Sequence, residues 1–367
     1  NPVIGLAASG SGNIPSFTTT NIGTSPIIAT ITVTPKANGC IGTSKTFTIT
    51  VNPSPTVDVL SNQTVCNGQL TTAILFSGAI PNTTYNWSND SPTIGIGATG
   101  VGAIPAFTAI NNGTTPVIAT ISVTPNLNGC PGSPKTFTIT INPSPSVNFT
   151  PTNQTLCSGS SSNLVNLSST ATGATFAWTS VQPAGVTGVI TSGTNSIPVQ
   201  TLINSTNLPI VVTCLATAES NSGVSCQGIS YPYTITVNPV PSVTTAQSQT
   251  ICSNTSFSII PFEGSGNIVP PGTTYSWGIP VVTGGVLGGA ALVNQTAIKG
   301  LLINPTDTVQ TATYTVTPKS GSCTGNTFTV VITINPSPKV TFSGSNQTVC
   351  CNGDSLPITL SSPTTGN

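Results

Sequence analysis

Ten cysteines are the residues of this sequence whose type and spacing could do chemistry. Most fall into an early and a late position that recur every 95 residues or so. The early positions are Cys66, Cys157, Cys252 and either Cys350 or Cys351, and the late positions are Cys40, Cys130, Cys226 and Cys323. Because the sequence has no histidine, Cys–His nucleophiles and the usual zinc sites lack a partner. The spacing therefore predicts disulfides and an oxidising, extracellular setting.

Two pairings of these cysteines are open. We expect pairing within a repeat, which gives Cys66–Cys130, Cys157–Cys226 and Cys252–Cys323. In an immunoglobulin-type strand order, however, the early and late positions lie at opposite ends of a sandwich. That separation is roughly 25 Å for an eight-residue strand, beyond the reach of a disulfide. A bond across a repeat junction, such as Cys66 with Cys226, is the alternative. Cys214 lies in the strand-like VVTCLAT and is either a buried thiol or a paired one.

Catalytic and metal-binding constellations are missing from the sequence. A Ser-His or Cys-His pair needs a histidine, and the six acidic residues are scattered rather than paired. A calcium site usually needs two or more nearby carboxylates. We therefore expect no enzyme activity, no catalytic residue, no metal and no cofactor.

The charge balance restricts the partners of the chain. Only 3% of the residues are charged, and six lysines balance six acids. Such a surface gives little counterion release, so we expect no nucleic-acid binding. No apolar run reaches the 18 or so residues that a membrane span needs. The expected partners are neighbouring repeats, identical chains and, as a further option, surface glycans.

The elements that must position the cysteines repeat along the chain. KTFTITVNPSP (45–55) returns as KTFTITINPSP (135–145), with weaker copies that end at Pro241 and Pro338. The period of about 95 residues fits one sandwich domain per repeat. We expect a partial first repeat (1–55), complete second, third and fourth repeats (56–143, 144–239 and 240–336) and a partial fifth repeat (337–367).

The two partial repeats leave two interpretations open. Together they nearly make one more repeat, without the segment that carries the tryptophan. We expect a window cut from a longer array. The alternative is a filament in which the strands of one chain complete the partial repeat of the next.

Alternation of side chains predicts β-strands throughout. In KTFTITV, Phe47, Ile49 and Val51 point one way and the threonines point the other. The preceding segment, 116–125 in the second repeat, is the expected hairpin partner, and 72–78 and 83–89 are expected as earlier strands. Trp87, Trp178 and Trp277 recur at equivalent positions, so we expect them in the cores of all-β sandwiches.

The combined pattern NQTVCNG…YNW…PVIATISVTP…NGC…KTFTITINPSP resembles a known family. It is similar to the PKD-like, immunoglobulin-like repeats of giant Bacteroidota cell-surface proteins, including gliding-motility adhesins exported by type IX secretion. The sequence lacks the WDFGDG motif of the original PKD pattern. The resemblance implies a tandem array of β-sandwich domains, and it implies O-glycosylation at Asp-Ser/Thr-apolar sites, which Thr308 and Ser355 fit.

These observations favour a structural function. We expect a segment of a long extracellular adhesin or fibre, whose repeats give reach and stiffness and support adhesion. A glycan-binding module is the alternative of another class, and exposure of Trp178 or Trp277 would favour it. A third possibility is a spacer attached to a catalytic domain elsewhere in the parent chain.

Overall fold

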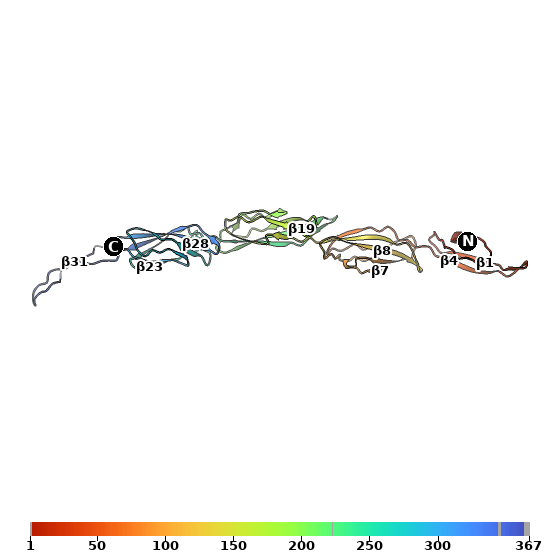
Figure 1. The fold of residues 1–367 in the computed structure, drawn as a ribbon, viewed down its shortest axis with the longest axis horizontal. Helices are drawn as coiled ribbons and strands as arrows, with labels where there is room; N and C mark the ends of the chain where they lie inside the picture. The colour runs from red at the N-terminus through yellow and green to blue at the C-terminus, as the bar shows by residue number, and fades with distance from the viewer. Residues whose placement is uncertain (1, 222, 344–345, 363–367) are drawn as a thin grey trace. The chain divides into compact units, whose positions relative to one another are not determined.

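The computed structural model describes residues 2–221, 223–343 and 346–362 (Figure 1). Within those ranges the chain is all-β, and its helical segments are the single 3-10 turns η1 (Pro2–Ile4) and η2 (Pro92–Ile94). The chain forms two compact units. The first contains the residues up to Asn148 together with Ser168–Phe176 and Thr217–Ser230. The second contains Phe149–Leu167, Ala177–Ala216 and the residues from Tyr231 onward.

The first unit holds the partial first repeat and the second repeat. Its strands are β1 (Ile27–Val33), β2 (Lys36–Ala37), β3 (Cys40–Ile41), β4 (Lys45–Val51), β5 (Gln63–Cys66), β6 (Thr84–Asn89), β7 (Thr99–Val101), β8 (Val117–Leu127), β9 (Cys130–Pro131), β10 (Lys135–Asn142) and β20 (Ser225–Gln227). β1 and β4 form a two-stranded hairpin, which Figure 1 shows in red and orange.

The main sheet of the second repeat has the order β5-β10-β8-β6-β7. β8 and β10 form the expected antiparallel hairpin, while β5 lies parallel to β10. Alternate residues of β10 are buried, namely Phe137, Ile139 and Ile141, as the period-two pattern predicts. The hairpin turn contains Asn128 and Gly129, both with positive φ.

The opposite face of the second repeat is less regular than the sequence predicts. Residues 72–78, expected as a strand, make only the isolated bridge between Ile74 and Ile104. A second bridge joins Leu70 and Thr108. The side chains still close the core, because Ile104 and Phe107 pack with the buried residues of β8 and β10.

The second unit contains most of the third repeat, the fourth repeat and the described part of the fifth. Its strands are β12 (Gln154–Cys157), β15 (Val186–Thr187), β16 (Ser192–Thr194), β17 (Ser196–Ile197), β18 (Ile203–Asn204), β21 (Tyr231–Asn238), β22 (Gln247–Cys252), β23 (Thr255–Ile259), β24 (Thr274–Trp277), β25 (Val281–Val282), β26 (Leu292–Gln295), β27 (Ile298–Leu302), β28 (Gln310–Ser320), β29 (Cys323–Thr324), β30 (Phe328–Asn335), β31 (Thr341–Ser343) and β32 (Thr359–Ser361). β11 (Asn148–Thr150), β13 (Val165–Ser168), β14 (Thr175–Ser180) and β19 (Ile210–Asn221) have residues in both units.

The third and fourth repeats reuse the sheet order of the second. Their main sheets run β12-β21-β19-β14-β16 and β22-β30-β28-β24-β26. In each, the first strand lies parallel to the last strand of the repeat. The same arrangement in three repeats places equivalent cysteines at equivalent ends of each sheet.

Candidate functional site at the repeat junctions

The early cysteine of each complete repeat lies at the exit end of the last strand. The parallel register pairs Cys66 with Asn142 and Cys157 with Asn238. The backbone N–H of the residue after the cysteine then donates to the asparagine carbonyl, at 2.8 Å in both repeats. Parallel pairing therefore fixes the early cysteine beside the point where the chain leaves the domain.

The late cysteine lies at the other end of its own repeat, in the tip of the last hairpin. Two residues after it is a glycine whose N–H closes the tip, and Gly228 donates to Ala218 at 2.8 Å. A Cβ on Gly228 would fall far inside van der Waals distance of the carbonyl oxygen of Pro145, a residue of the proline-rich linker. The Cys-x-Gly pattern thus lets the hairpin tip approach the linker.

The two sets of cysteines meet across the junctions between repeats. Cys66 is bonded to Cys226 with a Cα–Cα distance of 5.5 Å, and both residues belong to the first unit. Cys157 is bonded to Cys323 at 5.6 Å, within the second unit.

The expectation of within-repeat disulfides is therefore wrong. Cys130 and Cys252 are free thiols in the structure. Within a repeat, the early cysteine sits at the exit end of the sheet and the late cysteine sits at the entry end, so they cannot meet. The early cysteine of one repeat instead bonds the late cysteine of the next.

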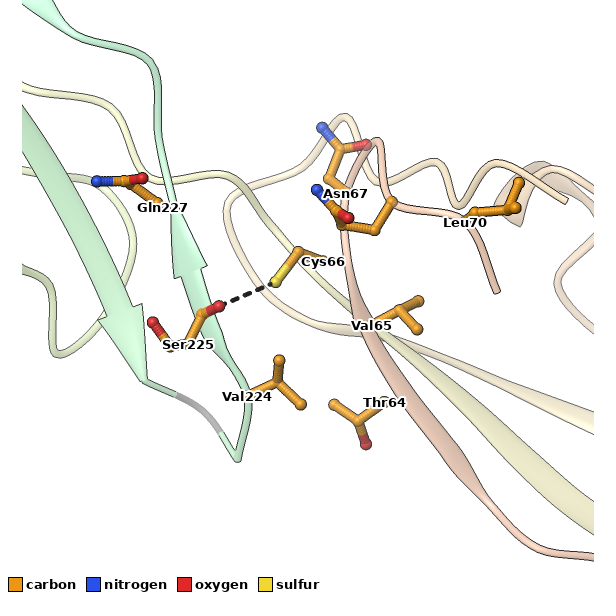
Figure 2. Close-up of a pocket in the computed structure, with 9 residues that line it drawn as sticks. Thr64, Val65, Cys66, Asn67, Leu70, Val224, Ser225 and Gln227 are labelled. Carbon is orange, nitrogen blue, oxygen red and sulfur yellow. Dashed lines mark hydrogen bonds between the residues drawn. The ribbon is translucent and has the colours of Figure 1, made fainter. Parts of the chain in front are cut away.

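A pocket of about 530 Å³ lies beside the Cys66–Cys226 bond. Figure 2 shows Cys66 facing Ser225 of β20, with Thr64 and Val65 on β5, the strand that also carries Cys66. The Sγ of Cys66 lies 3.5 Å from the carbonyl oxygen of Ser225. This is a sulfur–oxygen contact, because a disulfide sulfur carries no proton to donate. The described lining residues are uncharged, so the pocket supplies neither an acid–base group nor an ion-pairing group.

The shifted pKa values of ionisable groups elsewhere in the chain come from hydrogen bonding and burial. The backbone N–H of Thr120 donates to Asp90 at 2.8 Å, and this hydrogen bond lowers the pKa of that carboxyl. Burial raises the pKa of Tyr275 and of Tyr314 to about 12, and it raises the pKa of the Cys214 thiol. Within the described ranges, His, Cys, Asp and Glu side chains form no group of three that could hold a metal.

The tryptophans lie on the strands where the sequence places them. Trp178 and Trp277 are 2% and 4% exposed, and their Nε1 atoms donate to Ser196 and Ala290. Trp87 is half-buried against Gly100, its register partner on β7. The sheets thus hold all three indoles in packed positions.

An asparagine recurs in the first four repeats with a role that the sequence did not reveal, and it is half-buried at Asn21 but buried at Asn111, Asn204 and Asn304. Asn204 donates to the carbonyls of Leu208 and Val237 and accepts from the N–H of Thr206. The same three-bond arrangement recurs elsewhere at Asn21, Asn111 and Asn304. These residues tie the loop before the hairpin to the last strand. Their regular spacing, together with the turn-forming residues that follow them, could have predicted these loop contacts from the sequence.

The two predicted O-glycosylation residues are both exposed. Thr308 lies in the turn that Asn304 closes, where Gln310 donates to its Oγ1. Ser355 lies between Gln347 and β32. Their modification stays a prediction.

Comparison with known proteins gives one family match, which falls on two segments of the chain. A family model described as "PKD-like domain" matches residues 154–241 and 249–338. A search of curated proteins found no match. Among solved structures, an I-band fragment I67–I69 from titin is 10% identical, with a TM-score of 0.36, over 78% of this chain and 100% of that chain. Extracellular cadherin domains 3–6 of Protocadherin Gamma B2 are 12% identical, with a TM-score of 0.34, over 79% and 75%. Mouse Cadherin-23 EC22–24 is 13% identical, with a TM-score of 0.30, over 77% and 99%.

The fold and the family match together define the class. The chain is an all-β protein with tandem immunoglobulin-like sandwich repeats, two of which match the PKD-like model. None of the helices in the described ranges is long and apolar enough to cross a membrane.

Proposed function

We propose that this chain is a structural segment of a long extracellular surface adhesin or fibre. The observation that carries the proposal is the pair of junction disulfides. Cys66–Cys226 and Cys157–Cys323 each fasten one repeat to the next, so the covalent links serve the array rather than a single domain. Linked repeats resist separation under load, which a spacer between a cell and its target must do.

The family resemblance and the disulfides support the same proposal. The resemblance to Bacteroidota adhesins of the gliding-motility type, exported by type IX secretion, suggests a cell-surface location, and disulfides persist in such oxidising settings. The glycan-binding alternative is not favoured, because Trp178 and Trp277 are buried and offer no stacking surface. The domain boundaries set by the repeat period remain part of the proposal.

Surface labelling tests the location. An antibody against the chain should label intact cells that make the protein, and brief protease treatment of those cells should remove the signal. Labelling that appears only after the cells are permeabilised would contradict an extracellular role.

A further inference from the structure

Asn-Gly pairs occur five times in the sequence, at Asn38, Asn67, Asn112, Asn128 and Asn352. In such a pair the side-chain amide lies close to the backbone nitrogen of the next residue, and glycine has no Cβ to keep the two groups apart. Attack of that nitrogen on the side-chain carbonyl carbon gives a succinimide and releases ammonia. Because all five pairs share this local chemistry, the fold decides which of them can react.

Two of the pairs form the tips of hairpins. Asn38-Gly39 links β2 to β3, and Asn128-Gly129 links β8 to β9. Both residues of each two-residue loop have positive φ, at 47° and 85° in the first tip and at 49° and 80° in the second. This is the backbone of a type I′ turn, for which Asn-Gly is a preferred sequence. All four residues are exposed to solvent.

The reacting groups at these two tips are not restrained. The strand residues that flank a type I′ pair make the ladder bonds, which leaves the glycine N–H outside the ladder. Among the hydrogen bonds of the described residues, none involves the N–H of Gly39 or Gly129, and none involves the side chain of Asn38 or Asn128. A Cβ on either glycine would also meet nothing within 4 Å. Each glycine nitrogen can therefore approach its asparagine side chain without breaking a contact.

The pairs at Asn67 and Asn112 are held in place by hydrogen bonds. The N–H of Gly68 donates to the carbonyl of Ala109 at 2.8 Å, and the Oδ1 of Asn67 accepts from the N–H of Asn111 at 2.9 Å. The N–H of the glycine after Asn112 donates to the Oδ1 of Asn111 at 2.9 Å. In both pairs the attacking nitrogen must first lose a hydrogen bond. These pairs lie in the second repeat, as one of the two hairpin tips does, so they are internal controls.

We propose that Asn38 and Asn128 are sites of spontaneous deamidation, which gives negative charge to the hairpin tips of the first two repeats. The glycine nitrogen bonds to the Cγ of the asparagine, the Cγ–Nδ2 bond breaks, and the proton of the glycine N–H leaves with Nδ2 as ammonia. Water then opens the succinimide at either carbonyl and leaves an aspartyl or an isoaspartyl residue. Each event makes the chain more negative by one charge, starting from a formal net charge of zero.

The new charge at Asn128 arises beside the linker between the first two repeats. This hairpin tip packs against that linker, since a Cβ on Gly132 would stand 1.8 Å from the carbonyl oxygen of Pro55. The isoaspartyl form also adds a backbone atom to a two-residue turn, which disturbs the pairing of Leu127 with Cys130. Deamidation therefore loosens this tip as the protein ages.

Peptide mapping of the purified full chain tests the proposal. The folded protein is incubated in mildly alkaline buffer, and mass spectrometry follows the mass increase of deamidation and the isoaspartyl form at each Asn-Gly pair. We expect the two hairpin-tip pairs to convert at least roughly fivefold faster than the pairs at Asn67 and Asn112, which is the factor that one net hydrogen bond contributes. The pair at Asn352, whose glycine N–H donates to the carbonyl of Cys350 at 2.9 Å, should also be slow.

Two controls make the outcome specific. In denaturant with the disulfides reduced, all five pairs should convert at similar rates, because the fold no longer restrains any of them. Asn128→Gly keeps a turn-forming pair and should remove only the charge change of its own tip in isoelectric focusing, with circular dichroism as the check on folding. Equal rates at all pairs of the folded chain overturn the proposal. So does a selectivity for the hairpin tips that persists in the unfolded chain, because the fold would then not be its cause.

Discussion

Removing both junction disulfides should lengthen the stretched chain far more than removing either one. The two loops interleave, because Cys157 lies inside the Cys66–Cys226 loop and Cys226 lies inside the Cys157–Cys323 loop. In the oxidised chain, the shortest covalent path from Cys66 to Cys323 passes through both bonds and the residues between Cys157 and Cys226. That path has about 69 residues, or roughly 240 Å at about 3.5 Å per residue.

The variants should give lengths that do not add. Without both bonds the path from residue 66 to residue 323 is about 257 residues, or roughly 900 Å. Cys66→Ser alone leaves a path through Cys157–Cys323 of about 91 residues, or roughly 320 Å. Cys157→Ser alone leaves a path through Cys66–Cys226 of about 97 residues, or roughly 340 Å. Either disulfide alone therefore keeps the stretched chain short, and only the double variant lets it reach its full length.

Force spectroscopy measures these lengths directly. The chain is tethered at its two ends in non-reducing buffer and pulled until the sandwiches unfold, and the extension is compared among wild type, both single variants and the double variant. Cys252→Ser serves as the control, because that thiol is free in the structure and its loss should leave the extension unchanged.

One result would refute the connectivity. With bonds inside single repeats, Cys157→Ser would free the whole segment between Cys157 and Cys226, which is roughly 240 Å, and the effects of the variants would add. Interleaved bonds predict a gain of only about 100 Å for the same variant.

Three further predictions concern the stability of single repeats. Gly228→Ala should lower the free energy of unfolding by about 2–3 kcal/mol in denaturant, because the added Cβ would overlap the Pro145 carbonyl. The control Gly278→Ala, which has open space around it, should change that free energy by no more than about 0.5 kcal/mol. Equal effects of the two variants would argue against the close approach. Asn204→Ala should cost about 1–3 kcal/mol by the same measurement, because the buried carbonyl of Val237 loses its side-chain donor while the carbonyl of Leu208 keeps only Thr206 Oγ1. An unchanged free energy of unfolding would contradict a structural role for this asparagine. The fourth repeat should lose stability between pH 10 and about 12, because unfolding exposes tyrosines that ionise near pH 10 while the pKa values of Tyr275 and Tyr314 are about 12 in the fold. A denaturation midpoint that is flat over this window would contradict the assignment, and Tyr314→Phe should weaken the pH dependence.

The repeat architecture could be predicted from the sequence because its causes are local. The alternation of apolar and polar residues in KTFTITV and its copies, together with a glycine in the preceding turn, favours a hairpin, and the structure contains that hairpin in each repeat from the first to the fourth. The recurrence of Asn-Pro after the hairpin marks where one domain ends, since proline cannot extend the ladder. The absence of histidine likewise limited the chemistry of the cysteines before any fold was known.

The cysteine partners depended on contacts between distant parts of the chain. No local pattern says that the first strand of a repeat lies parallel to its last strand, yet that pairing places Cys66 at the exit end of its domain. In the structure the expected strand at 72–78 makes a single bridge, and Asn204 is buried against the last strand, where it donates to the Val237 carbonyl. The sequence by itself determined a tandem array of sandwiches with cysteines at fixed intervals. Only the tertiary structure decided that these cysteines join one repeat to the next, because a disulfide depends on distance in space rather than on spacing along the chain.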